Sequence, residues 1–255
     1  MVLGLEGLES NCGWSTDSLF PQAYFTPLVR LQDGLHVKME NCLPGNNAVS
    51  RALQAIYEKR ERRGGEARSG MSVRADIHED EVLSFLSFCF WHGLRPVIAP
   101  EMHVPGGGLE GAVMRGRDAE LFLDLNGDEE GARAYYRYTG VELWSQAGGG
   151  EITDIVVPVR DGRIISGLGG AFFRERNENI RIVAVLQGGE RTEERFGGIR
   201  RHVESLPPAL NPSVIDRSFT VSPQDAERSR VDLFKSRGGL ISGPRGGQLR
   251  CTWRR

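Results

Sequence analysis

The sequence predicts an α+β protein: a mixed or mainly antiparallel sheet packed against two to three helices, followed by an irregular, proline-rich C-terminal extension. Three observations support this class. Helical and strand-like patterns alternate along the chain, but they do not repeat as regular βα units. Asp161-Gly162 separates two runs rich in β-branched residues, which is typical of a two-residue hairpin turn. Residues 206–212 contain three prolines, which favours an irregular connection.

The first elements of the chain are short strands and one amphipathic helix. Strands are expected over residues 23–31 and 35–39. A helix is expected over residues 49–63, because apolar residues recur there with helical spacing. Asn46 or Asn47 is its expected N-cap, and two consecutive glycines end it.

A second helix is expected in the middle of the chain. Residues 76–79 resemble a capping box, with Asp at the cap and Glu three residues later. The following segment, 82–91, is apolar on nearly every side, so we expect a central, buried helix. Strands over 96–99 and 119–125 and a helix over 129–139 complete this part.

The C-terminal half contains further strand-like segments, which we expect at residues 152–159, 163–166, 180–186 and 214–221. The proline-rich segment is the predicted domain boundary. It divides the chain into an α+β core domain, residues 1–206, and a C-terminal extension with an arginine-rich tail, residues 207–255.

The composition is that of a globular protein. The chain has 255 residues, of which 39% are hydrophobic and 26% charged, so it is neither a disordered tract nor a fibre. No apolar run approaches the roughly 18–20 residues that a membrane span needs, and the first residues are acidic rather than basic, unlike a signal peptide. We therefore expect a cytoplasmic protein with no membrane partner.

The basic residues are almost all arginine. Lys38, Lys59 and Lys235 are the only lysines in the sequence, and this scarcity argues against chemistry that requires lysine. The net charge of −2 hides an acidic middle between two basic segments. Acid-free basic tails are typical of polyanion binding, so nucleic-acid contacts are predicted for Arg237, Arg245, Arg250, Arg254 and Arg255.

The cysteines and histidines form no recognisable metal motif. Four cysteines are too widely spaced for a CxxC pair, and no HExxH is present. The glycine-rich stretches lack the lysine of a phosphate-binding P-loop. We therefore assign neither a metal nor a cofactor.

One fragment suggests nucleophilic catalysis. Cys42 precedes the helix expected over residues 49–63, and a helix N-terminus favours a thiolate. Asn-Cys-Leu at 41–43 and Arg-Ala-Leu at 51–53 resemble the two halves of the OTU-type cysteine protease signature, separated here by seven residues where that family has one. The resemblance implies a cysteine-dependent hydrolase, for which His103, beside a glycine loop, is the candidate base.

The charge segregation and the irregular termini favour a different class. They predict a non-enzymatic assembly or binding protein that self-associates as a homo-oligomer, for example a coat protein of a virus or phage. Its arginine-rich tail is expected to contact RNA. A cysteine-dependent hydrolase that uses Cys42 and His103 is the alternative hypothesis.

Overall fold

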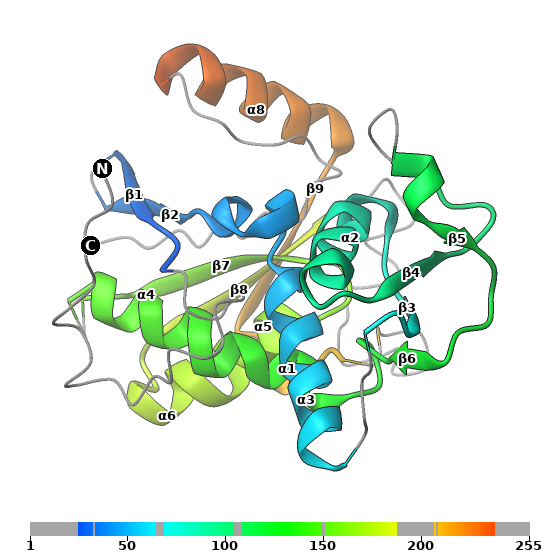
Figure 1. Ribbon diagram of the computed structural model, residues 1–255. Helices are drawn as coiled ribbons and strands as arrows, with labels where there is room; N and C mark the ends of the chain where they lie inside the picture. Colours follow the sequence, from blue (N-terminus) through cyan, green and yellow to red (C-terminus); the bar gives the residue numbers. More distant parts are fainter. Residues whose placement is uncertain are drawn as a thin grey trace, which may run out of the picture.

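The computed structural model describes residues 25–32, 34–64, 69–104, 109–148, 151–187, 207 and 209–237. Its strands form two parallel sheets and one separate hairpin (Figure 1). The first sheet has the order β5-β4-β3-β6 and the second has the order β7-β8-β9. The strands are β1 (Leu28–Gln32), β2 (Leu35–Lys38), β3 (Ser72–Ala75), β4 (Arg95–Ile98), β5 (Met114–Arg115), β6 (Leu121–Leu123), β7 (Asp154–Val159), β8 (Arg181–Gln187) and β9 (Arg217–Val221).

The helical segments connect these strands. The α-helices are α1 (Val49–Arg62), α2 (Val82–Trp91), α3 (Glu129–Ala134), α4 (Val141–Gln146), α5 (Arg163–Ile165), α6 (Arg174–Arg176) and α8 (Pro223–Arg237). Shorter or wider helical turns are η2 (Glu40–Cys42), η3 (Pro44–Asn46), η4 (Glu79–Glu81), η5 (Leu109–Ala112), η6 (Tyr135–Gly140), η7 (Ser166–Phe173) and η9 (Pro212–Val214). Helix α2 matches the helix expected at residues 82–91.

The predicted α+β class with a mainly antiparallel sheet is wrong. Every strand pair within the two larger sheets is parallel, and only the β1–β2 hairpin is antiparallel. Parallel neighbours need a long crossover, which α2 provides between β3 and β4 and the helical run from α5 to α6 provides between β7 and β8. The architecture is therefore α/β.

The segment at Asp161-Gly162 is not a hairpin turn. Gly162 does adopt the left-handed conformation that such a turn needs, with φ of 86°. The chain then enters α5 instead of a strand, and the helix continues through η7 to Arg176. Both a hairpin and a strand-to-helix turn can use a left-handed glycine, so the dipeptide alone does not distinguish them.

The C-terminal extension is also more regular than predicted. Strand β9 pairs in parallel with β8 over five residue pairs, from Val183 with Arg217 to Gln187 with Val221. Helix α8 follows at the periphery of the molecule (Figure 1). The boundary predicted between residues 206 and 207 stays a prediction.

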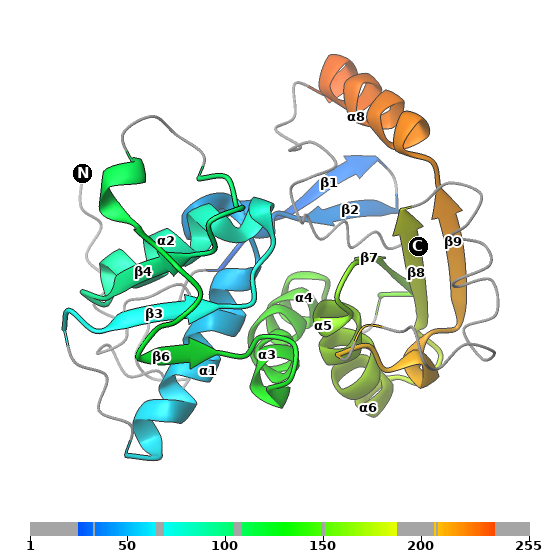
Figure 2. The same cartoon turned by 90° about the vertical axis from the view of Figure 1, so that its right-hand side faces the viewer.

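One hydrophobic core joins both sheets. Buried side chains from β3 and β6, such as Val73 and Leu123, belong to the same cluster as Ile155 of β7 and Ile182 of β8. Figure 2 shows the two sheets on either side of helices α3 and α5. Among the helices in the described ranges, none is long and apolar enough to cross a membrane.

Candidate functional site at the carboxyl edges of the sheets

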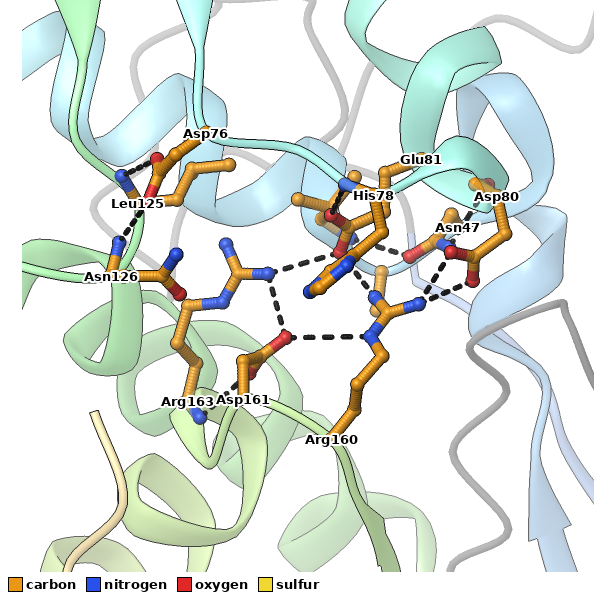
Figure 3. Close-up of polar contacts among 12 residues, drawn as sticks. Asn47, Asp76, His78, Asp80, Glu81, Leu125, Asn126, Arg160, Asp161 and Arg163 are labelled. Carbon is orange, nitrogen blue, oxygen red and sulfur yellow. Dashed lines mark hydrogen bonds and ion pairs between the residues drawn. The ribbon is translucent and has the colours of Figure 1, made fainter. Parts of the chain in front are cut away.

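The carboxyl ends of β3, β6 and β7 bring together a cluster of charged side chains. In open parallel sheets, ligands bind outside the carboxyl ends of the strands. Here the chain leaves β3 toward η4, β6 toward α3, and β7 toward α5. Figure 3 shows the polar side chains that these three connections present to one another.

Arg160 links the two sheets. It directly follows β7, and its Nη1 donates to both carboxylate oxygens of Asp80 in η4, at 2.5 and 2.6 Å. Its Nη2 donates to Oε1 of Glu81 at 2.5 Å. Both terminal nitrogens of this guanidinium are therefore bonded to carboxylates of η4, the turn that follows β3 of the first sheet.

Arg163 is the buried centre of the cluster. Its side chain is only 2% exposed, and its Nη2 donates to Glu81 Oε1 at 3.0 Å and to Asp161 Oδ2 at 2.8 Å. Its Nε and Nη1 are buried without a hydrogen-bond partner among the described residues. A buried donor left unpaired costs about 1–3 kcal/mol, so an acceptor that reached these two nitrogens would be bound favourably.

The local sequence fixes this geometry. Gly162 takes a positive φ that other residues rarely adopt, and this turns the chain sharply from β7 into α5. Asp161 Oδ1 accepts a hydrogen bond from the backbone N–H of Arg163 at 2.9 Å. Glu81 is held from its own side, because its Oε2 accepts from the backbone N–H of His78 at 2.9 Å.

The pKa values of two carboxylates at the site, Asp161 and Asp76, are shifted in opposite directions. Burial tends to raise the pKa of Asp161, but hydrogen bonding and charge from Arg163 and Arg160 outweigh it and hold that pKa below the usual value. Burial raises the pKa of Asp76, although its carboxylate accepts from the backbone N–H groups of Leu125 and Asn126. These contacts tie the end of β3 to the end of β6.

A second buried charge cluster lies next to α1. Lys38 Nζ donates to Glu142 at 2.5 Å, to the Thr26 carbonyl at 2.6 Å and to Gln146 at 2.9 Å. Arg51 pairs with Glu40 at 2.9 Å and with Glu142 at 2.7 Å. Since all three donors of the ammonium are used, this cluster has a structural role.

The residues predicted for catalysis are not brought together. Cys42, at the end of η2, and His103 are both exposed, and no hydrogen bond joins them in the described part of the chain. Arg237 is the last residue of α8, while Arg245, Arg250, Arg254 and Arg255 lie outside the described residues. No group of three or more metal-binding side chains occurs within the described ranges.

The charged cluster around Arg163 was not predicted from the sequence, because the two segments that form it each match a local structural motif. Residues 76–79 were interpretable as a helix cap and Asp161-Gly162 as a turn. Both segments directly follow strand-like runs. Because the carboxyl ends of parallel strands meet at one edge of a sheet, this position could have indicated the site.

The fold of this chain resembles that of a solved enzyme structure. The chain superposes on a hydrogen sulfide-producing enzyme from Fusobacterium nucleatum with a TM-score of 0.69 and 17% identity, over 88% of this chain and 86% of that one. At this identity the likeness shows the fold, which is the pyridoxal phosphate (PLP) fold with parallel α/β sheets.

Several enzymes are also similar to this chain in sequence. The chain is 33% identical over 145 residues to cysteine synthase B of Escherichia coli, an alignment that covers 53% of this chain and 46% of that protein. It is 27% identical over 253 residues to cysteine synthase B of Salmonella typhimurium, covering 86% and 82%.

A third relative is the O-acetylserine dependent cystathionine β-synthase of Bacillus subtilis, 25% identical over 154 residues, with 56% and 49% coverage. The chain thus spans about half the length of the Escherichia coli and Bacillus subtilis relatives. No protein-family model matches it.

These similarities overturn the predicted functions. All four similar proteins are enzymes by name, so the interpretation as a non-enzymatic, coat-like, RNA-binding structural protein is wrong. The same finding overturns the cysteine-dependent hydrolase with Cys42 and His103. Segregated charges and irregular termini occur in proteins of many functional classes, so they do not distinguish an enzyme from a structural protein. Self-association as a homo-oligomer stays a prediction.

The cofactor that the fold implies does not fit the residues of this chain. PLP is held in such enzymes through a Schiff base with a lysine amine. The three lysines are Lys38, in the buried cluster beside α1, Lys59, whose Nζ pairs with Asp128 at 2.6 Å, and Lys235, exposed on α8. None of them contributes a contact to the cluster around Arg163.

Proposed function

We propose that this chain is a cysteine synthase-like protein of sulfur amino-acid metabolism, and that it binds a small amino acid at the charged cluster around Arg163. The names of the similar proteins include cysteine, O-acetylserine, cystathionine and hydrogen sulfide. The observation that carries the proposal is the pair of unpartnered nitrogens on Arg163. Nε–H and Nη1–H point to opposite sides of the guanidinium, and each can donate to an acceptor such as a carboxylate oxygen.

The charge of the cluster favours a zwitterion over a simple anion. Three carboxylates, from Asp80, Glu81 and Asp161, stand against the two guanidinium groups of Arg160 and Arg163. A carboxylate ligand can bond to Arg163, while the surplus negative charge attracts an ammonium group nearby. An α-amino acid carries both groups, whereas inorganic phosphate carries only negative charge.

Calorimetric titration of the purified chain tests this proposal. We expect O-acetyl-L-serine or L-cysteine to bind, and Arg163→Lys to weaken binding about tenfold or more, because lysine keeps the charge but loses the planar set of N–H donors. Arg181→Lys is the matched control, since Arg181 makes a similar two-nitrogen contact with Asp154 outside the site. Its binding should equal that of the unchanged chain.

Two outcomes would contradict the proposal. If the unchanged chain binds neither amino acid, or if Arg163→Lys binds them equally well, Arg163 does not hold a carboxylate and its free nitrogens are satisfied by buried water alone. If inorganic phosphate binds more tightly than both amino acids, the site does not select a zwitterion.

We also propose that the protein works in the cytosol. Cys42 and Cys89 are free thiols in the described part of the chain, as is usual in a reducing compartment. Survival of activity and fold in a reducing buffer, with no change in unfolding midpoint, supports this assignment.

A further inference from the structure

We infer that this chain works without PLP, and that the ion-pair cluster of Asp80, Glu81, Arg160, Asp161 and Arg163 stands at the carboxyl edge where a PLP fold would hold its cofactor. The inference rests on the fold and on the chain's own residues. It is independent of the proposed amino-acid ligand.

The first argument concerns the lysine amines. A Schiff base forms when a neutral amine attacks the aldehyde carbon of PLP, a C=N bond replaces the C=O bond, and water leaves. Burial lowers the pKa of Lys38, against the opposing charge of Glu142, but this amine already donates to three acceptors. A C=N bond at Nζ would leave at most one N–H for these three acceptors and would break up the buried cluster.

The remaining two lysines do not supply the amine either. Lys59 extends from the last turns of α1 and forms an ion pair with Asp128, the residue that caps α3. Lys235 lies on α8 at the periphery of the molecule, after the last strand (Figure 2). Within the described residues, neither lysine forms a hydrogen bond or ion pair with the side chains labelled in Figure 3.

The second argument concerns the phosphate group of PLP. Phosphate sites are built from free backbone N–H groups and spare cationic donors. Here the backbone N–H of Arg163 is already bonded to Asp161, and both terminal nitrogens of Arg160 are bonded to Asp80 and Glu81. The unpartnered donors that are left on the side chain of Arg163 are Nε and Nη1, which do not form a cradle of several N–H groups. A phosphate dianion would also face three carboxylates, which repel it.

The third argument is that the ion pairs of the cluster are part of the packing between the two sheets. Glu81 and Arg163 are each about 2% exposed at the side chain, and they join η4 of the first sheet to α5 of the second. Breaking such a pair leaves an uncompensated buried charge. The pair therefore holds η4 and α5 together through the chain's own side chains.

Borohydride trapping tests the inference. The purified full chain is incubated with PLP, reduced with sodium borohydride, which converts any C=N bond to a stable C–N bond, and analysed by intact mass and peptide mapping. We expect no saturable label on Lys38 and no rise in unfolding midpoint with PLP. Slow, non-saturable labelling at exposed lysines, removed in the Lys59→Arg, Lys235→Arg double variant, agrees with the inference.

One result would overturn it: a single phosphopyridoxyl group per chain that saturates with PLP, maps to one lysine and accompanies a visible imine absorption band. The amino-acid titration is performed on the same protein without PLP. Loss of amino-acid binding therefore overturns only the proposed function, and saturable trapping overturns only the inference about the cofactor.

Discussion

At the scale of single residues, this protein contains buried charges that are almost completely paired. Glu142, Lys38 and Arg51 are each 3% exposed or less at the side chain. Burying such groups is costly unless each has a partner. Glu142 accepts from both cations, so it is the residue on which the pairing in the cluster beside α1 depends most.

Replacing Glu142→Gln should therefore destabilise the fold strongly. The change removes one negative charge and leaves Lys38 and Arg51 to share Glu40, and breaking a buried pair in this way costs about 3–5 kcal/mol. Urea unfolding measures the loss. Arg117→Ala is the control, because its pair with Glu101 is exposed on both sides and should contribute less than about 1 kcal/mol. Equal losses in the two variants would contradict the structural role of Glu142.

The acid stability of the protein should depend on Asp161. Its folded pKa lies below its unfolded value, so its contribution is fully present above about pH 4 and is lost as the pH falls through the folded pKa. We expect Asp161→Asn to have a shallower fall in unfolding free energy below pH 4 than the unchanged chain. Urea midpoints measured at neutral pH and at several acidic values check the slope. Glu101→Gln should keep the original slope, and identical slopes for all three proteins would refute the prediction.

At the scale of elements, the turn from β7 into α5 connects the site with the C-terminal segment. A side-chain carbon added at Gly162 would lie 2.5 Å from the Cα of Leu210, which shows how closely residues 209–211 pack on this turn. Ser166 Oγ, one turn further along, donates to the carbonyl of Ala209 at 2.8 Å. The segment that precedes η9 and β9 is thus anchored directly behind the charged cluster.

This close approach predicts different costs for two glycine substitutions. Gly64 and Gly162 both have positive φ, 80° and 86°, but nothing lies within 4 Å of a side chain added at Gly64. Gly64→Ala should cost only the conformational penalty of about 1 kcal/mol. Gly162→Ala should add an overpacking cost of about 1–3 kcal/mol and weaken amino-acid binding. Thermal unfolding of both variants measures the difference, and equal midpoints would contradict the packing argument.

At the scale of the whole molecule, two parallel sheets share one core and meet at one charged edge. The core cluster contains residues from β3, β6, β7 and β8 together with α1 and α2. Because the hydrophobic contacts already join the sheets, the ion pairs of Arg160 and Arg163 are not needed to hold them near each other. Their effect is to fix which side chains face one another at the carboxyl edge, and therefore what the edge can bind.

Much of the local structure could be predicted from the sequence. The apolar segment 82–91 is α2 at the expected boundaries, and the strands expected over 152–159 and 180–186 correspond to β7 and β8. The N-cap of α1 is Ala48, not the expected Asn46 or Asn47, but Asn47 Oδ1 accepts from the first helical N–H of α1, at Val49. These features depend on spacing and on side chains close in sequence, which local patterns record directly.

The sequence by itself determined several of the short helices and strands, the presence of only three lysines and the excess of arginine over lysine. Only the tertiary structure decided that the strands run parallel and that Glu81 meets Arg163 across 82 positions of sequence. The physical reason is that strand direction and long-range ion pairs depend on crossovers and on a shared core, which no local pattern encodes. The scarcity of lysine gained its meaning in the same way, once the structure placed Lys38 and Lys59 in ion pairs with Glu142 and Asp128 and Lys235 on α8.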